Sequence, residues 1–213
     1  MNISILITSA DHPIHIYLAK WINEISDSHN VKIFNSADQL TNGKILFLIS
    51  CSEIVPSEIR AKFLKVLVIH ASDLPIGRGW SPHIWEIILG ATVVTLSLLE
   101  AEDEVDTGNI WKKLKVKIPK TALFNEINQL IFSAEIKLMD YAIDNFDNIR
   151  PEKQSNKNSS YFSKRTPKDS EIDISDSLSN QFNLIRVCDT DRYPAYFYKH
   201  GKRFSITINN YDE

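Results

Sequence analysis

Short apolar runs alternate with helix-spaced apolar residues along most of the chain, and this alternation limits the fold more than any other feature. A strand buried on both faces is a continuous apolar run, whereas a helix covering a sheet repeats apolar residues every three or four positions. Such alternation is typical of a mostly parallel sheet with helices on both faces, so we predict an α/β, Rossmann-like fold. The predicted strands are 3–8, 31–34, 44–50, 65–70 and 91–100, and the predicted helices are 14–25, a short one from Pro56, 81–90 and 120–146.

Composition changes after residue 149 and divides the chain into three segments. Residues 1–149 carry the alternating pattern and form the predicted main domain. Residues 150–176 are polar and poor in apolar side chains, which is typical of a linker or an extended surface arm. Residues 177–213 contain a helix-like segment, 177–187, and a predicted hairpin that turns at His200 and Gly201. We therefore expect a small C-terminal helix and β-hairpin appended to the main domain.

Charge and hydropathy argue against several classes of protein. The formal net charge of −3 argues against a protein that mainly grips nucleic acid, which needs a dense basic surface. No apolar stretch approaches the ~20 residues of a membrane span, and the first residues lack the basic region of a signal peptide. Cys51 and Cys188 lack the spacing of a zinc site or a disulfide framework. We expect a cytoplasmic protein with no metal site.

Two loops that follow predicted strands carry the candidate chemistry, because ligands of doubly wound sheets bind outside the carboxyl ends of the strands. The loop 70–82 contains a histidine, two glycines and an arginine, and the loop 100–111 contains five acidic residues. Asp106 beside His70 would form a general acid–base pair, because a carboxylate orients the imidazole and supports its charged form. A structural histidine and a solvated acidic turn are the alternative that these residues leave open.

These segments resemble the signature of the folate-dependent formyltransferases, which include the methionyl-tRNA, glycinamide ribonucleotide and sugar-nucleotide enzymes. The resemblance covers most of residues 45–110, and the separation of 36 residues between His70 and Asp106 matches the family's spacing. The segments that carry it are His70-Ala71-Ser72-Asp73-Leu74-Pro75, Arg78-Gly79, VDTGNI at Val105–Ile110, and SEIVP at Ser52–Pro56, where the family has a turn that touches folate.

The resemblance implies a reaction and a set of site residues. The reaction is transfer of a formyl group from N10-formyltetrahydrofolate to a primary amine, with His70 and Asp106 as the catalytic residues. His70 would hydrogen-bond the developing oxyanion, and Asp106 would keep His70 protonated or take the amine proton through it. The residues implied to contact folate are Ser50, Ser52, Glu53, Ile54, Val55, Arg78, Gly79, Asp103, Glu104 and Val105. A hydrogen bond that stabilises the loop is the alternative role for Arg78.

Position 68 departs from the family's pattern, which has an asparagine two residues before the histidine. Val68 has no hydrogen-bonding side chain. A serine at 50, 52 or 72 could supply the missing group, or His70 could suffice alone. The third alternative is a catalytically impaired relative that binds folate or a nucleotide without turnover, and a module that kept the fold alone is a further one.

The segment after residue 149 guides the expected acceptor. Residues 164–175, 183–187 and 193–198 resemble the segment after the catalytic domain in sugar N-formyltransferases, which also occurs in the tRNA enzymes before a full β-barrel. The acidic balance and the single hairpin favour a nucleotide-linked amino sugar over a nucleic acid, and hence a role in O-antigen or other surface-glycan biosynthesis. We also expect a homodimer through the C-terminal region. The residues expected to bind the acceptor are His12, Asp73, Trp80 and Tyr193, and packing beneath the loop is the alternative for Trp80.

Overall fold

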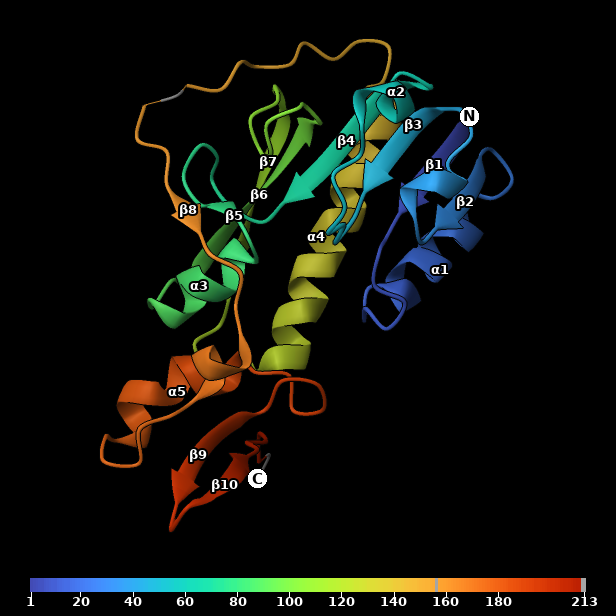
Figure 1. Ribbon diagram of the computed structural model, residues 1–213. Coiled ribbons are helices and arrows are strands. Elements are labelled where there is room, and N and C mark those ends of the chain that lie inside the picture. The colour runs from blue at the N-terminus through green and yellow to red at the C-terminus, as the bar shows by residue number, and fades with distance from the viewer. Residues whose placement is uncertain (156, 212–213) are drawn as a thin grey trace.

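A six-stranded sheet forms the centre of the protein in a computed structural model that describes residues 1–155 and 157–211. The strand order is β2-β1-β3-β4-β6-β7, and the first four strands pair in parallel (Figure 1). This arrangement confirms the predicted α/β fold with a mostly parallel sheet. The strands are β1 (Asn2–Leu6), β2 (Asn30–Phe34), β3 (Gly43–Leu48), β4 (Phe63–His70), β6 (Val93–Glu100) and β7 (Ile110–Lys117).

The last two strands run in directions that the sequence did not reveal. β6 is antiparallel to β4, and β7 is antiparallel to β6, so the two form a hairpin. Neighbouring strands do supply His70 and Asp106, but because β4 and β6 are antiparallel the two strands do not end at the same edge of the sheet. His70 pairs with Ser97 inside the sheet, and Asp106 reaches His70 through the hairpin loop that follows β6. β7 was not among the predicted strands, because its alternating lysines give no continuous apolar run.

Helices cover both faces of the sheet, as predicted, but unequally. The larger core lies between the sheet and α1 (His15–Ile25), α3 (Pro82–Ile88) and α4 (Phe124–Asp144). On the opposite face, the described residues form the short helices η1 (Ala37–Gln39) and α2 (Ser57–Arg60) over a smaller core. The indole of Trp21 on α1 donates to Asp140 on α4 at 2.6 Å, which joins the two long helices.

The polar segment after α4 is an arm that follows the edge of the main domain (Figure 1). Glu152 and Ile110 exchange two backbone hydrogen bonds of 2.8 Å. Further along, β8 (Tyr161–Phe162) pairs in parallel with β5 (Arg78–Gly79), and the 3-10 helix η2 (Pro167–Ser170) follows. The arm thus contacts both of the loops that the sequence singled out.

The C-terminal segment contains α5 (Leu178–Arg186) and a hairpin of β9 (Ala195–Lys199) and β10 (Lys202–Ile206). The buried guanidinium of Arg186 donates to the carbonyl oxygens of Pro119 at 2.9 Å and Ala122 at 3.0 Å, just before α4. These bonds anchor α5 to the main domain. The three-segment division and the homodimer stay predictions. In the part of the chain that the structure describes, every helix is too short or too polar to cross a membrane.

We predict that Arg186→Met lowers the free energy of unfolding by about 2–4 kcal/mol, because it leaves the carbonyl group of the buried Ala122 without its described donor and removes one of two donors from the Pro119 carbonyl group. Urea unfolding followed by circular dichroism measures the change. Lys202→Met, at an exposed hairpin position, is the matched control and should change stability by less than about 0.5 kcal/mol. Equal stability of both variants would show that Arg186 does not anchor α5.

Candidate active site

A cavity of about 790 Å³ lies beside the carboxyl ends of β1, β3 and β4. This volume is within the usual range for small-molecule sites. Most of the residues singled out from the sequence line it: His12, Ser50, Ser52, Glu53, Ile54, Val55, His70, Gly79, Trp80, Asp103, Val105, Asp106 and Tyr193. Val68, at the position that departs from the family's pattern, also lines the cavity.

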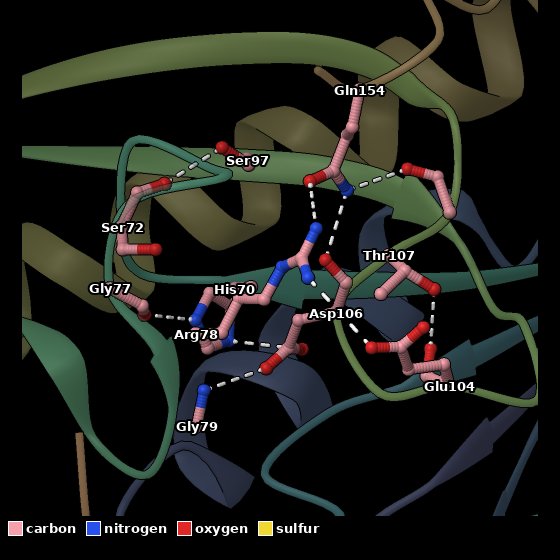
Figure 2. A network of polar contacts seen from close by, with 11 residues as sticks. His70, Ser72, Gly77, Arg78, Gly79, Ser97, Glu104, Asp106, Thr107 and Gln154 are labelled. Atoms are coloured by element: carbon pink, nitrogen blue, oxygen red, sulfur yellow. Dashed lines mark hydrogen bonds and ion pairs between the residues drawn. The ribbon is translucent and has the colours of Figure 1, made fainter. Parts of the chain in front are cut away.

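His70 and Asp106 meet at this cavity, and both side chains are buried (Figure 2). The His70 Nδ1 lies 3.4 Å from the Asp106 Oδ1, and the Nε2 lies 2.8 Å from the carbonyl oxygen of Gly77. A carbonyl only accepts hydrogen bonds, so Nε2 carries a proton and donates it. The contact with Asp106 is then attractive only when a second proton lies between Nδ1 and Oδ1. The buried carboxylate therefore faces the ring nitrogen that is left free by the Gly77 contact, an arrangement that orients the imidazole.

The backbone around Asp106 holds the carboxylate in place. Asp106 has φ +60°, a left-handed conformation that aspartate tolerates better than most residues. Its Oδ2 accepts a hydrogen bond of 2.9 Å from the Gly79 amide. Gly108 allows the loop to fold back onto β6, because a side-chain carbon there would overlap the Glu100 carbonyl group. A glycine is thus required at position 108 for steric reasons.

Gln154 of the arm forms hydrogen bonds with the same loop (Figure 2). Its buried amide donates to the carbonyl oxygens of Asp106 at 3.0 Å and Gly108 at 2.7 Å. A side-chain amide that satisfies two buried carbonyl groups restricts the loop that carries Asp106. Sequence reasoning missed Gln154, because it lies in a polar stretch of low apolar content.

The arm also fastens the loop that follows His70. Ser160 accepts from the Arg78 amide at 2.9 Å through its carbonyl, and its hydroxyl accepts from the Gly77 amide at 2.9 Å. Gly79 has φ +96°, and a side chain there would overlap Phe162 and Tyr161. Glycine is needed at position 79 because β8 lies so close to the loop that a side chain would not fit.

Three of the residues predicted to contact folate or the acceptor lie outside the cavity lining. The Asp73 carboxylate forms an ion pair of 2.5 Å with Lys113 of β7 instead of facing the cavity. The Arg78 guanidinium lies 3.5 Å from the side-chain oxygen of Gln154 and 4.0 Å from the Glu104 carboxylate. The loop-stabilising alternative accounts for these contacts of Arg78. Glu104 itself is exposed on the outer side of its loop.

The serines near Val68 already have partners or face away. The Ser50 hydroxyl lies 3.1 Å from the His12 Nε2, and the Ser52 hydroxyl lies 3.0 Å from the Thr8 hydroxyl. Ser72 is fully buried outside the cavity lining. Among the residues in the described ranges, the side-chain amide that lines the cavity comes from Asn128 on α4. A polar residue that interrupts the apolar face of a helix is a signal that could have identified Asn128.

Trp80 and Tyr193 lie at the rim of the cavity. The Lys164 ammonium lies 4.6 Å from the Trp80 ring centroid, so the indole is covered by a cation from the arm. Tyr193 is 58% exposed, and the Arg192 guanidinium lies 5.8 Å from its ring centroid. Both aromatic side chains are therefore beside cations, an arrangement suited to a ligand that carries phosphate and a flat base.

Burial shifts the pKa of several groups that line the cavity. Burial lowers the pKa of His12 and of His83 to about 4, so both are neutral near pH 7. The Ile14 amide donates to the His12 Nδ1 at 3.3 Å, so the His12 proton is on Nε2 and points to Ser50. Burial raises the pKa of Glu135 on α4 to about 8. Sequence reasoning assigned no role to Glu135 or to a buried His83.

A comparison with protein families decides the relationship. The model of the family described as "Formyl transferase" matches residues 11–143, and this range holds both loops and most of the cavity. The chain belongs to the formyl transferase family. The match confirms the resemblance that the two loops carry.

Individual members of the family share modest sequence identity with the chain. The chain is 25% identical over 194 residues to the methionyl-tRNA formyltransferase of Rickettsia bellii (strain RML369-C). The aligned residues cover 85% of this chain and 63% of that relative. The chain thus spans less than two thirds of the length of this relative. A solved structure named methionyl-tRNA formyltransferase from Clostridium thermocellum superposes with a TM-score of 0.83, 26% identity, and coverage of 100% of this chain and 94% of that one.

Two further solved structures share the fold at lower identity. A sugar N-formyltransferase from Shewanella sp. FDAARGOS_354 has a TM-score of 0.75 and 17% identity, with coverage of 100% of this chain and 99% of that one. HypX from Aquifex aeolicus, solved in complex with tetrahydrofolic acid, has a TM-score of 0.79 and 20% identity, with coverage of 94% of this chain and 36% of that one. Solved structures that share this fold thus include proteins named for different acceptors, methionyl-tRNA and a sugar.

We predict that protein stability falls as pH rises from about 6.5 to 8, and that Glu135→Gln flattens this slope. The pKa of Glu135 is raised from 4.5 to about 8 in the folded state, so the folded protein binds a proton that the unfolded chain has lost. A full proton is worth about 1.4 kcal/mol per pH unit. His12 and His83 act with the opposite sign, but below their unfolded pKa of 6.5.

Urea unfolding at several pH values measures the slope. Glu24→Gln on α1, where the carboxylate is exposed beside Lys20, should retain the slope of the unsubstituted protein. A Glu135→Gln protein with an unchanged slope would contradict the raised pKa.

Proposed function

We propose that this chain transfers a formyl group from N10-formyltetrahydrofolate to the amine of a nucleotide-linked amino sugar. The observation that carries the proposal is the buried His70–Asp106 contact of 3.4 Å at the cavity. A histidine–carboxylate pair at a ligand cavity is what acyl transfer between two nitrogens requires, because one nitrogen loses a proton and the other gains one.

The residues around the cavity fit a folate as co-substrate. Val55 and Leu48 offer apolar surface from the β3 side, and the backbone and side chains of residues 52–54 and 103 provide polar groups. Membership of the family and the tetrahydrofolic acid complex of HypX support this co-substrate. The formyl donor is consumed in each turnover, so the protein has to bind it and release it rather than retain it.

His70 and Asp106 have complementary roles in the proposed reaction. The acceptor nitrogen bonds to the formyl carbon while the bond from that carbon to N10 breaks. The Nε2–H of His70, which donates to the Gly77 carbonyl in this structure, exchanges that partner for the developing oxyanion. The proton between Nδ1 and Asp106 supports the positive charge on the ring, and the proton lost by the acceptor nitrogen balances the one gained by N10. Donors aimed at an oxyanion are worth about 3–4 kcal/mol each.

The surroundings of the cavity support a phosphate-bearing acceptor of moderate size. Lys164, Arg165 and Arg192 line it, with Trp80 and Tyr193 beside two of these cations. Arginine and lysine side chains bind phosphate oxygens strongly, and the aromatic rings offer surfaces for a base. The overall charge of −3 disfavours a large nucleic acid. A protein that works on a sugar nucleotide of this kind belongs in the cytoplasm, in surface-glycan biosynthesis.

The decisive experiment is a transfer assay with N10-formyltetrahydrofolate and a panel of acceptors, read by mass spectrometry. The panel contains nucleotide-linked sugars with the amine at different ring positions and, as a separate arm, methionyl-tRNA. We expect formylation of at least one amino sugar. Formylation of methionyl-tRNA alone would replace the proposed acceptor, and binding of folate by calorimetry without any turnover would favour the impaired relative.

We predict that His70→Ala and Asp106→Ala each lower kcat by a factor of about 10²–10⁴, because each removes half of the histidine–carboxylate pair. Steady-state kinetics with the acceptor found in the panel measures the loss. His200→Asn is the control, since it replaces an exposed histidine in the hairpin turn with a residue that tolerates its φ of +51°. Rates near those of the unsubstituted protein for either alanine variant would refute the assignment.

We predict that Val68→Asn raises kcat about tenfold, because the amide adds a hydrogen-bond donor to the cavity near His70. Val68 is half-buried and lines the cavity, so the new group faces the site. The measurement is kcat beside the unfolding midpoint of the variant. A stable variant with unchanged kcat would show that another group already supplies this donor.

A further inference from the structure

One face of α4 forms a wall of the cavity. The α4 residues that line it are Phe124, Asn128, Ile131, Phe132 and Glu135. Their spacing of three and four positions places them along one side of the helix. Glu135 is the ionisable member of this set, and the Phe132 ring one turn before it lies 5.5 Å from the His12 ring. The helix therefore presents one carboxyl group to the cavity among mainly apolar neighbours.

The carboxyl group of Glu135 has no protein partner in the described part of the chain. Its residue is 8% exposed, and the Oε2 is buried without a hydrogen bond. Burying an unpaired carboxyl group costs several kcal/mol unless it stays protonated, which is why its pKa rises to about 8. A ligand that brings a hydrogen-bonding or charged partner into the cavity would explain why an unpaired carboxyl group is buried in its lining.

The cations that line the cavity have no described contact with Glu135. Each of the four has a described contact that does not involve Glu135: Arg60 with Asp103, Lys164 with Trp80, Arg165 with Asp169 and Ser170, and Arg192 with Asp189. The neighbouring His12 and His83 are neutral near pH 7, since burial lowers the pKa of both. The missing partner of Glu135 is therefore a positive group of small size from outside the chain.

We propose that Glu135 receives the ammonium group of the acceptor and takes its first proton. This inference rests on the proposed function, because a primary amine enters the cavity as an ammonium ion and must lose one proton before its lone pair can attack carbon. As the ammonium group enters, the Glu135 carboxyl group first releases its own proton to solvent. One proton then moves from the acceptor nitrogen to the carboxylate oxygen, so that Glu135 is again a neutral acid and the amine is free to attack. The second proton leaves the nitrogen after attack and balances the proton that N10 gains when its bond to the formyl carbon breaks.

The surroundings suit this role. A carboxyl group whose pKa lies near that of the amine can share the ammonium proton at little cost, whereas an exposed carboxylate is a much weaker base. The pair also becomes neutral after transfer, which matches the apolar surface of Ile131 and Phe132. A hydroxyl acceptor brings no positive charge, so Glu135 selects amine over hydroxyl at the same position.

The test follows the Glu135 carboxyl carbon by carbon-13 NMR in the full chain, and Glu135→Gln identifies the signal. The first probe is n-propylammonium chloride, with n-propanol and sodium chloride as controls. We expect a saturable shift and a lower titration midpoint with the ammonium, no change with either control, and no change at the exposed Glu24. If n-propylammonium changes neither the chemical shift nor the titration midpoint of Glu135, the proposal is overturned, even if the chain formylates amino sugars.

A kinetic arm separates this inference from the proposed function. With the acceptor found in the panel, Glu135→Gln should lower kcat/KM at least tenfold and remove one group from the acid side of the pH profile, while Glu24→Gln leaves both unchanged. An unaltered pH profile for Glu135→Gln would overturn the inference. Absence of transfer to every amine, together with an intact NMR response, would count against the proposed function and leave the ammonium site standing.

Discussion

The contact between His70 and Asp106 is the constraint on which the rest of the site depends. It joins a residue at the end of β4 to a residue in the β6–β7 loop, and these strands run in opposite directions. Nothing in the sheet alone brings the two side chains together. The loop reaches its position through the left-handed backbone of Asp106 and the close approach at Gly108. The geometry of one histidine–carboxylate pair therefore accounts for several unusual backbone features.

Much of the fold followed from the sequence because continuous apolar runs and helical spacing report burial directly. The first four strands, the long helix and the terminal hairpin were predicted in this way. β7 was not predicted, because its alternating lysines remove the continuous apolar run by which the other strands were identified. The direction of β6 was also hidden, because a run that is buried on both faces has the same composition in either orientation. His70 and Asp106 were identified because their spacing in the sequence resembles the family's pattern. That resemblance did not predict how the two side chains are arranged in space.

Other site residues could not be predicted because their role depends on long-range contacts. Gln154 is one amide in a polar stretch, and only the folded chain shows it donating to two loop carbonyl groups. Asp73 lies within the motif, yet β7, a strand that was not predicted, supplies its partner Lys113. Glu135 is a single acid on an amphipathic helix. Its role is visible only in the folded chain, where it lines the cavity and has no described partner.

The arm has a consequence for the order in which the protein gains its site. The sheet, both loops and α4 are complete in the chain by residue 149, but Glu152, Gln154 and the β8 strand that hold the loops come later. During synthesis the main domain can thus fold around its core while its two reactive loops are still unfastened. The positions of both reactive loops therefore depend on a segment that lies after the sheet and α4 in the chain. The core without this segment would lack the hydrogen bonds that hold the loops of His70 and Asp106.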